Sequence, residues 1–205
     1  ADYLVYGRGE RSSVELARCF DQGCRDYEFH KIPQIGYLDK GGRNRGKETI
    51  VLKSYEEALS SKRVFVENFN IIETEANKMH SARLVEPYED EEVVINPPYP
   101  PATTEEMDSY FDLPFTKLPH PRYKGKRIPA YDMIKFSINI HHGCFGGCSF
   151  CTIAAHQERF IQSRSRNNIV NEINKLVLHP EFKGVISDVG APTANMYKMR
   201  GKNPQ

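Results

Sequence analysis

The sequence predicts an α/β protein whose two parts are joined by a proline-rich linker. Strand-like and helix-like patterns alternate near both ends of the 205-residue chain. Nine of the 13 prolines lie between Pro87 and Pro129, and a segment of this composition does not sustain helices or central strands. Three of the five cysteines follow one predicted strand within eight residues. We therefore divide the chain into parts at 1–86, 87–130 and 131–205.

The N-terminal part is predicted to alternate strands and helices. The expected elements are a strand at 3–6, a short helix that ends at Gly23, a pair of strands at 29–39 and a long helix at 55–77. Ser54 and Glu57 have the spacing of a capping box, which places the start of the long helix at Tyr55. Within the linker, only the segment that begins at Thr103 is expected to start a helix.

The C-terminal part is predicted to form a strand, a helix and a second strand. Phe136, Ile138 and Ile140 alternate with polar residues, as in a strand with two different faces. Ser165 has the position of a helix cap, and 184–190 is typical of a buried strand. Together these elements predict a right-handed βαβ unit with parallel strands. The cysteines then lie on the loop after the first strand, where such folds bind ligands.

Charge and hydropathy exclude several classes of protein. Lys and Arg number 28 against 27 Asp and Glu, which leaves a net charge of +1 and indicates no nucleic-acid partner. No apolar run approaches the ~20 residues that a membrane-spanning helix needs. The first residues carry neither an initiator Met nor a signal pattern. We therefore expect no membrane partner, no secreted precursor, a cytoplasmic location and a chain that begins inside a fold.

Three cysteines form the strongest motif in the sequence. Cys144, Cys148 and Cys151 are separated by three and then two residues, and glycines between and before them allow a tight loop. Close thiolates in such a loop can each hold one iron of a 4Fe-4S cluster, which leaves the fourth iron open for an exogenous ligand. Cys19 and Cys24 lie far from this motif and are expected to be packing residues.

Two other interpretations of the motif remain open. The three cysteines could bind zinc together with His141 or His142, as a Cys₃His site in an interaction module. They could also hold an iron–sulfur cluster that only carries electrons. The zinc interpretation is weakened because structural zinc sites usually use two ligand pairs that are well separated in sequence, and here all candidates lie in one loop.

The wider sequence resembles the YgiQ-type proteins of the radical S-adenosylmethionine (SAM) superfamily. The motif Cys144-x₃-Cys148-x₂-Cys151, with Phe150 before the last cysteine, is similar to the cluster motif of that superfamily. Further similar segments are ADYLVYG at 1–7, NPP at 96–98, TTEEM at 103–107, IQSRS at 161–165, GVISDVG at 184–190 and PTANMY at 192–197. The resemblance therefore extends over nearly the whole chain.

The resemblance implies a set of cofactor-binding residues. The three cysteines would ligate three irons, the fourth iron would chelate SAM, and Phe150 would lie beside the adenine. Gly190, Ala191 and Pro192 stand where the superfamily has a Gly-Gly-Glu-Pro-like motif whose backbone meets the SAM amino group. The sequence departs from that pattern because the Glu is missing and Ala191 replaces a common glycine.

The resemblance also implies a fold and an activity. Residues 1–86 would be the end of a Rossmann-like, cobalamin-binding-like domain, and 131–205 the first βαβ unit of a radical SAM (β/α) barrel. Such an enzyme cleaves SAM reductively to a 5′-deoxyadenosyl radical and receives its electron from a donor such as flavodoxin or ferredoxin. No histidine pattern for ligating cobalamin is present, so cobalamin is not expected.

Several properties cannot be predicted from the sequence. The substrate is unknown, and the roles of His141, His142, Arg159 and Arg164 are not assigned. A complete (β/α) barrel takes ~200 residues or more, so we expect the chain to be a fragment, inactive alone and poorly stable because of open strand edges.

Overall fold

The computed structural model describes residues 2–40, 46, 48–191 and 195–201. The chain forms two compact units. Unit 1 contains residues 1–100, 146–159 and 201–205, and unit 2 contains residues 101–145 and 160–200.

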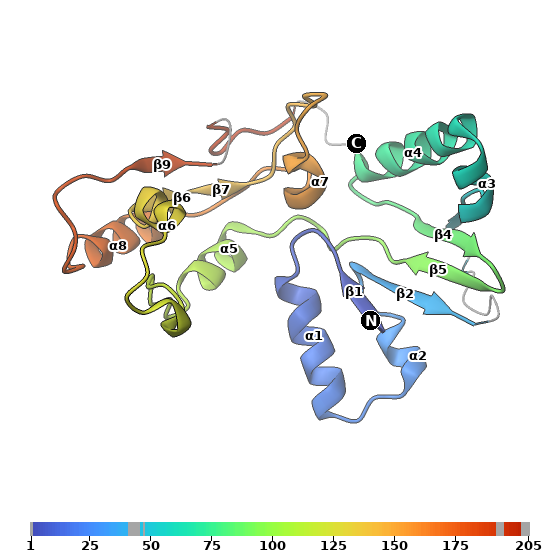
Figure 1. Cartoon of the computed structure of the whole chain (residues 1–205), viewed down its shortest axis with the longest axis horizontal. Helices are drawn as coiled ribbons and strands as arrows, with labels where there is room; N and C mark the ends of the chain where they lie inside the picture. The colour runs from blue at the N-terminus through green and yellow to red at the C-terminus, as the bar shows by residue number, and fades with distance from the viewer. Residues whose placement is uncertain (1, 41–45, 47, 192–194, 202–205) are drawn as a thin grey trace. The chain divides into compact units, whose positions relative to one another are not determined.

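Unit 1 is a five-stranded sheet with helices (Figure 1). Its strands are β1 (Tyr3–Val5), β2 (Ile35–Asp39), β3 (Thr49–Val51), β4 (Arg83–Tyr88) and β5 (Glu91–Ile95). Its helices are α1 (Glu10–Asp21), α2 (Asp26–Phe29), α3 (Tyr55–Ser60), α4 (Lys62–Ala76) and α7 (Ile153–Gln157). The strand order is β1-β2-β5-β4-β3, and only the β3–β4 pair is parallel.

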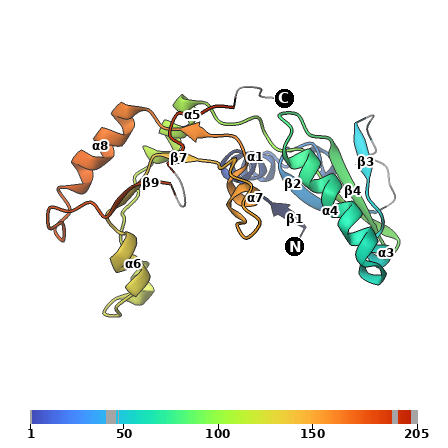
Figure 2. The same cartoon turned by 90° about the horizontal axis from the view of Figure 1, so that it is seen from above.

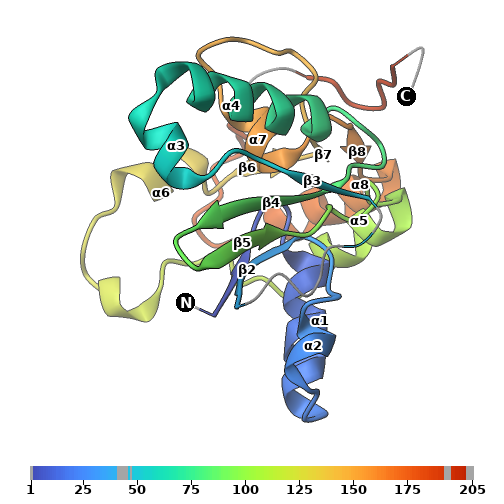
Figure 3. The same ribbon diagram turned by 90° about the vertical axis from the view of Figure 1, so that its right-hand side faces the viewer.

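One face of this sheet carries the hydrophobic core of unit 1. Tyr37, Val94 and Val85 are aligned across neighbouring strands and belong to the buried core. This core also contains Phe29 of α2, and Cys19 and Cys24 pack against it. The prediction that these two cysteines are packing residues is thus confirmed. In Figure 3, α3 and α4 lie above the strands and α1 and α2 lie below them.

Two predictions for unit 1 are wrong in part. The segment 29–39 forms one strand, β2, instead of a pair, because Phe29 ends α2 and residues 30–34 form turns. The helix expected at 55–77 is divided at Ser61, which adopts an extended backbone with φ −138° and ψ 114°. The Ser61 side chain accepts a hydrogen bond from Val64 N and starts a second helix. The capping box of Ser54 and Glu57 is confirmed.

The prediction that the proline-rich segment contains no central strand is also wrong. Strand β5 lies between β2 and β4 in the sheet. It contains no proline, and its Val93, Val94 and Ile95 are residues that favour strands. Pro87 lies in β4 at a position that β3 does not reach, so its missing N–H leaves no gap in the β3–β4 ladder.

Unit 2 contains the expected strand–helix–strand arrangement. Its elements are α5 (Thr104–Phe111), a 3₁₀ turn (Pro121–Tyr123), α6 (Pro129–Ile134), β6 (Ser137–Asn139), β7 (His141–His142), β8 (Gln162–Ser163), α8 (Arg166–Leu176) and β9 (Asp188–Gly190). Strands β6 and β9 pair in parallel, and α8 connects them in sequence. Figure 2 shows these elements from a second direction.

The core of unit 2 lies between these strands and α8. Ile138, Ile140, Ile169 and Leu176 form one buried cluster. The predicted caps are confirmed, since Thr103 accepts a hydrogen bond from Glu106 N and Ser165 accepts one from Asn168 N. The second strand, β9, is shorter than the expected 184–190 and more exposed. Asp188 and Val189 are exposed, and of its three residues only Gly190 is buried.

The α/β class is therefore confirmed, while the Rossmann-like and barrel assignments of the parts stay predictions. None of the helices in the described ranges has the length and apolar character needed to cross a membrane.

Candidate functional site

The residue before the first cysteine of the motif is held in a tight backbone crossing. Gly143 has φ 89°, and a Cβ atom built on it would lie 2.0 Å from the carbonyl oxygen of Phe160. This contact arises because β7 pairs with β8, which follows Phe160 by two residues. Only glycine satisfies both the positive φ and the close approach. The pairing of β7 and β8 thus fixes the backbone at the start of the cysteine loop.

The three cysteines of the motif are accessible thiols without disulfide partners. Cys148 is exposed, and Cys144 and Cys151 are half-buried. Cys151 N donates a hydrogen bond of 3.0 Å to Cys148 O, which places these two residues at the ends of one turn. Gly147, beside Cys148, has φ 60°. Within the described ranges, no group of three or more His, Cys, Asp or Glu side chains converges as a metal site.

The residues predicted to contact SAM have different surroundings. Phe150 is 88% exposed, as a side chain free to cover a ligand would be. Gly190 is buried at the end of β9, pairs with Asn139, and accepts a 3.0 Å hydrogen bond from Ile140 N. Ala191 is half-buried, and Pro192 lies outside the described residues.

The side chain of His141, in β7, contacts the backbone of Met196 within unit 2. Its side chain is 1% exposed, and Nε2 accepts a hydrogen bond of 3.0 Å from Met196 N. Because Nε2 is the acceptor, the neutral ring carries its proton on Nδ1. His141 thereby fixes the backbone at Met196. His142 lies edge-on to the ring of Phe111, with centroids 5.7 Å apart.

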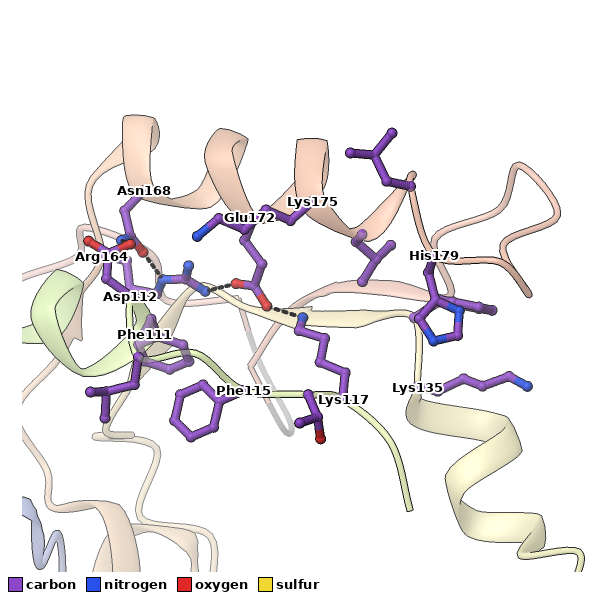
Figure 4. Close-up of a pocket in the computed structure, with 15 residues that line it drawn as sticks. Phe111, Asp112, Phe115, Lys117, Lys135, Arg164, Asn168, Glu172, Lys175 and His179 are labelled. Atoms are coloured by element: carbon purple, nitrogen blue, oxygen red, sulfur yellow. Dashed lines mark hydrogen bonds and ion pairs between the residues drawn. The ribbon is translucent and has the colours of Figure 1, made fainter. Parts of the chain in front are cut away.

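A buried arginine forms the centre of a polar cluster in unit 2 (Figure 4). The Arg164 side chain is fully buried, and its Nη1 donates to Glu172 Oε2 at 2.5 Å and to Asn139 O at 2.6 Å. Its Nε donates to Asn168 Oδ1 at 2.7 Å. The guanidinium carbon lies 4.1 Å from the centre of the Phe111 ring. These contacts pair Nε and Nη1 of the buried charge, whereas Nη2 has no hydrogen-bond partner among the described residues.

The polar cluster around Arg164 also includes residues of the predicted linker. Glu172 forms a second ion pair with Lys117 Nζ, so its carboxylate lies between the cations of Arg164 and Lys117 (Figure 4). Asn168 Nδ2 donates to Asp112 Oδ1 at 2.9 Å, and Asp108 Oδ1 accepts from Ser165 N at 2.8 Å. Residues around these contacts line a cavity of about 210 Å³. Residues 101–117, which lie within the predicted linker at 87–130, therefore belong to unit 2.

The spacing of three polar residues in the sequence indicates this cluster, although they form no known motif. Arg164, Asn168 and Glu172 are spaced four residues apart, so their side chains share one face of α8 and its N-terminal turn. Arg159, the other unassigned arginine, forms an ion pair of 2.5 Å with Glu73 within unit 1. Both arginines are thus engaged by carboxylates.

The chain matches the protein family described as radical SAM N-terminal over residues 1–137. The chain belongs to this radical SAM N-terminal family. The three cysteines lie beyond the matched residues, at 144–151.

The chain is also similar to individual proteins over most of its length. It is 50% identical to a UPF0313 protein of Bacteroides thetaiotaomicron over 99% of its own length and 35% of that protein. It is 50% identical to the UPF0313 protein YgiQ of Salmonella typhimurium and 49% identical to that of Escherichia coli, in both cases over 78% of this chain and 22% of the relative. The resemblance to YgiQ-type proteins is confirmed. The chain spans about a third of the length of its first relatives.

Proposed function

We propose that this chain carries the cluster-binding loop of a radical SAM iron–sulfur enzyme. The observation that carries the proposal is the motif Cys144-x₃-Cys148-x₂-Cys151, which begins seven residues after the last residue matched to the radical SAM N-terminal family. Thiolates are the usual protein ligands of 4Fe-4S clusters, and three of them leave one iron open for SAM. When bound, the cluster supplies the electron that cleaves SAM to a 5′-deoxyadenosyl radical.

The residues of the loop fit such a group by their chemistry. All three cysteines of the motif are free thiols with access to solvent. Gly143 and Gly147 have positive φ values of 89° and 60°, so the backbone can curve tightly around a ligand. A zinc site of the Cys₃His type would need His141 or His142. Nε2 of His141 is already engaged by Met196 N, which disfavours this histidine as a ligand.

Other residues of the chain would orient the second ligand. The backbone around Gly190 and Ala191 would meet the SAM amino group, and Phe150 would cover the adenine. The hydrogen bond from Met196 N to His141 fixes the backbone at Met196, so His141 would act as a positioning residue. The 88% exposure of Phe150 leaves its ring free to cover a ligand. We expect the enzyme to act in the cytoplasm with a flavodoxin- or ferredoxin-like electron donor.

The proposal is tested on the full-length protein by anaerobic reconstitution with iron and sulfide, followed by dithionite and SAM. We expect 5′-deoxyadenosine to form in the wild type and in a Cys24→Ser control. It should be absent from Cys148→Ser. A brown protein that forms no 5′-deoxyadenosine would support the electron carrier instead, and zinc without acid-labile sulfide would support the interaction module.

A further inference from the structure

One face of the sheet in unit 1 contains a row of apolar residues with a gap. Leu4 of β1, Gly36 of β2, Ile95 of β5 and Leu84 of β4 are paired successively across four strands. Gly36 is in the middle of this row, so a side chain is missing there. The gap forms part of the floor of a cavity of about 300 Å³.

The backbone does not require glycine at position 36. Its φ is not in the positive range that favours glycine. A Cβ atom there would lie 3.7 Å from Val94 O and 3.9 Å from Leu4 Cβ, which are ordinary van der Waals contacts. A glycine inside a strand costs stability, because it has no side chain to pack and more entropy to lose. The effect of Gly36 is therefore to keep the cavity open.

Small residues also form the walls of the cavity. Ala76 of α4 and Ala154 and Ala155 of α7 line it opposite the sheet, and Figures 1 and 2 both place α7 beside α4. The ion pair of Arg159 with Glu73 joins the segment after α7 to α4 at the same cavity. The cavity is partly open to solvent and mostly apolar, as sites for small molecules are. A flat floor opposite short side chains leaves a slot, whose shape suits a planar ring.

Two of the residues that line the cavity each have a buried polar atom without a hydrogen-bond partner in the described part of the chain. These atoms are Oδ1 of Asn96, a residue that is 2% exposed, and Oγ of Ser81. The Asn96 amide nitrogen is already used, because it donates to His30 O and Ile32 O. The remaining carbonyl oxygen is an acceptor without a donor, which is costly when buried. A ligand N–H or O–H group would satisfy it.

Backbone strain occurs at the edge of the same cavity. Gln34 has φ 62°, and Glu158 has φ 68° with ψ 170°, a conformation that is essentially restricted to glycine. Strain of this kind is often retained at ligand sites. It accompanies the cavity and the unsatisfied acceptor, and it points to the same place.

We propose that unit 1 binds a planar, mostly apolar ring compound over Gly36, of the size of a two-ring heteroaromatic with one N–H or O–H donor. The ring lies against Leu84 and Ile95, and its donor is directed to Asn96 or Ser81. This site lies wholly within unit 1 and involves none of the three cysteines of the motif. Its test is therefore independent of the cluster proposal.

The test uses the 205-residue chain with indole as the probe, in ligand-observed NMR and calorimetric titration. Gly36→Val fills the cavity from the sheet, and Ala76→Leu fills it from α4. Leu38→Val is the matched control, because Leu38 lies on the same face of β2, outside the cavity lining, and is 49% exposed. We expect both filled variants to raise the dissociation constant by about tenfold or more, and the control to leave it unchanged.

Two further measurements sharpen the test. Thermal unfolding should show that Gly36→Val is at least as stable as the wild type, because a β-branched side chain suits a strand and fills an empty space. 1-Methylindole, which lacks the N–H donor, should bind more weakly than indole. The proposal is overturned if indole fails to bind the wild type at millimolar concentration, or if both filled variants bind it as the wild type does. Equal binding of 1-methylindole would contradict the donor contact.

Discussion

A side chain at Gly143 would clash with Phe160, because its Cβ would lie 2.0 Å from the Phe160 carbonyl oxygen. This crossing is one residue before the first cysteine of the motif. It links the pairing of β7 and β8 to the position at which the cysteine loop begins.

Gly143→Ala should therefore destabilise the chain strongly. Both the positive φ of 89° and the clash contribute, so we expect a loss of about 3 kcal/mol or more. Gly184→Ala is the matched control, since Gly184 has φ 84° but no atom within 4 Å of its built Cβ. The control should lose only about 1 kcal/mol. Urea unfolding measures both, and equal losses would show that the crossing has no energetic role.

The carboxylate of Glu172 should be essential to the polar cluster of unit 2. Glu172→Gln keeps the shape of the side chain but removes the charge opposite the fully buried Arg164. Leaving a buried charge without its ion partner costs about 3 kcal/mol. Lys117→Met removes the other ion pair of Glu172, but the Lys117 side chain is 33% exposed and should contribute less than about 1 kcal/mol. A larger loss in Lys117→Met would contradict this order.

Glu75 should make unit 1 sensitive to acid. Burial raises the pKa of Glu75, but hydrogen bonds from Lys78 and from Ala82 N outweigh this effect and hold the pKa below its usual value of 4.5. A lowered folded-state pKa gives stability that is present above the unfolded pKa and is lost as the pH falls through the folded value.

Comparing Glu75→Gln with the wild type as a function of pH tests this. At pH 7 the variant should be less stable by about 1 kcal/mol, because the ion pair with Lys78 is lost. The difference should disappear as the pH falls below 4.5 and through the folded-state pKa of Glu75. A difference that stays constant down to strongly acidic pH would contradict the assignment.

His141 should protect the segment after β9. His141→Phe keeps a buried ring but removes the acceptor for Met196 N. We expect hydrogen exchange of the Met196 amide to become about tenfold faster or more, with little change at Asn168, whose amide donates to Ser165. Unchanged exchange at Met196 would show that His141 does not position this segment.

The sequence predicts well those elements whose ends have local causes. The caps at Ser54, Thr103 and Ser165 need only neighbouring residues, and all three are present. The break at Ser61 was missed because its side chain competes for the backbone N–H of Val64 within an otherwise helical sequence.

Features that depend on distant residues were predicted less well. The high proline content of 87–130 as a whole predicts a linker that includes β5. The residues between Pro87 and Pro97 contain no proline, however, and β5 forms there. The burial of Arg164 depends on Asn139, on Phe111 and on α8, which are far apart in sequence. The cysteine motif is visible in the sequence because its three cysteines lie in one short loop, and their role as cluster ligands stays a prediction.

The most direct test of the central claim is the iron and acid-labile sulfide content of the anaerobically reconstituted 205-residue chain. If the three cysteines hold a 4Fe-4S cluster, the wild type and Cys24→Ser should contain about four irons and four sulfides per chain, and Cys148→Ser should lose the cluster. Zinc without sulfide, or an undiminished cluster in Cys148→Ser, would contradict the claim.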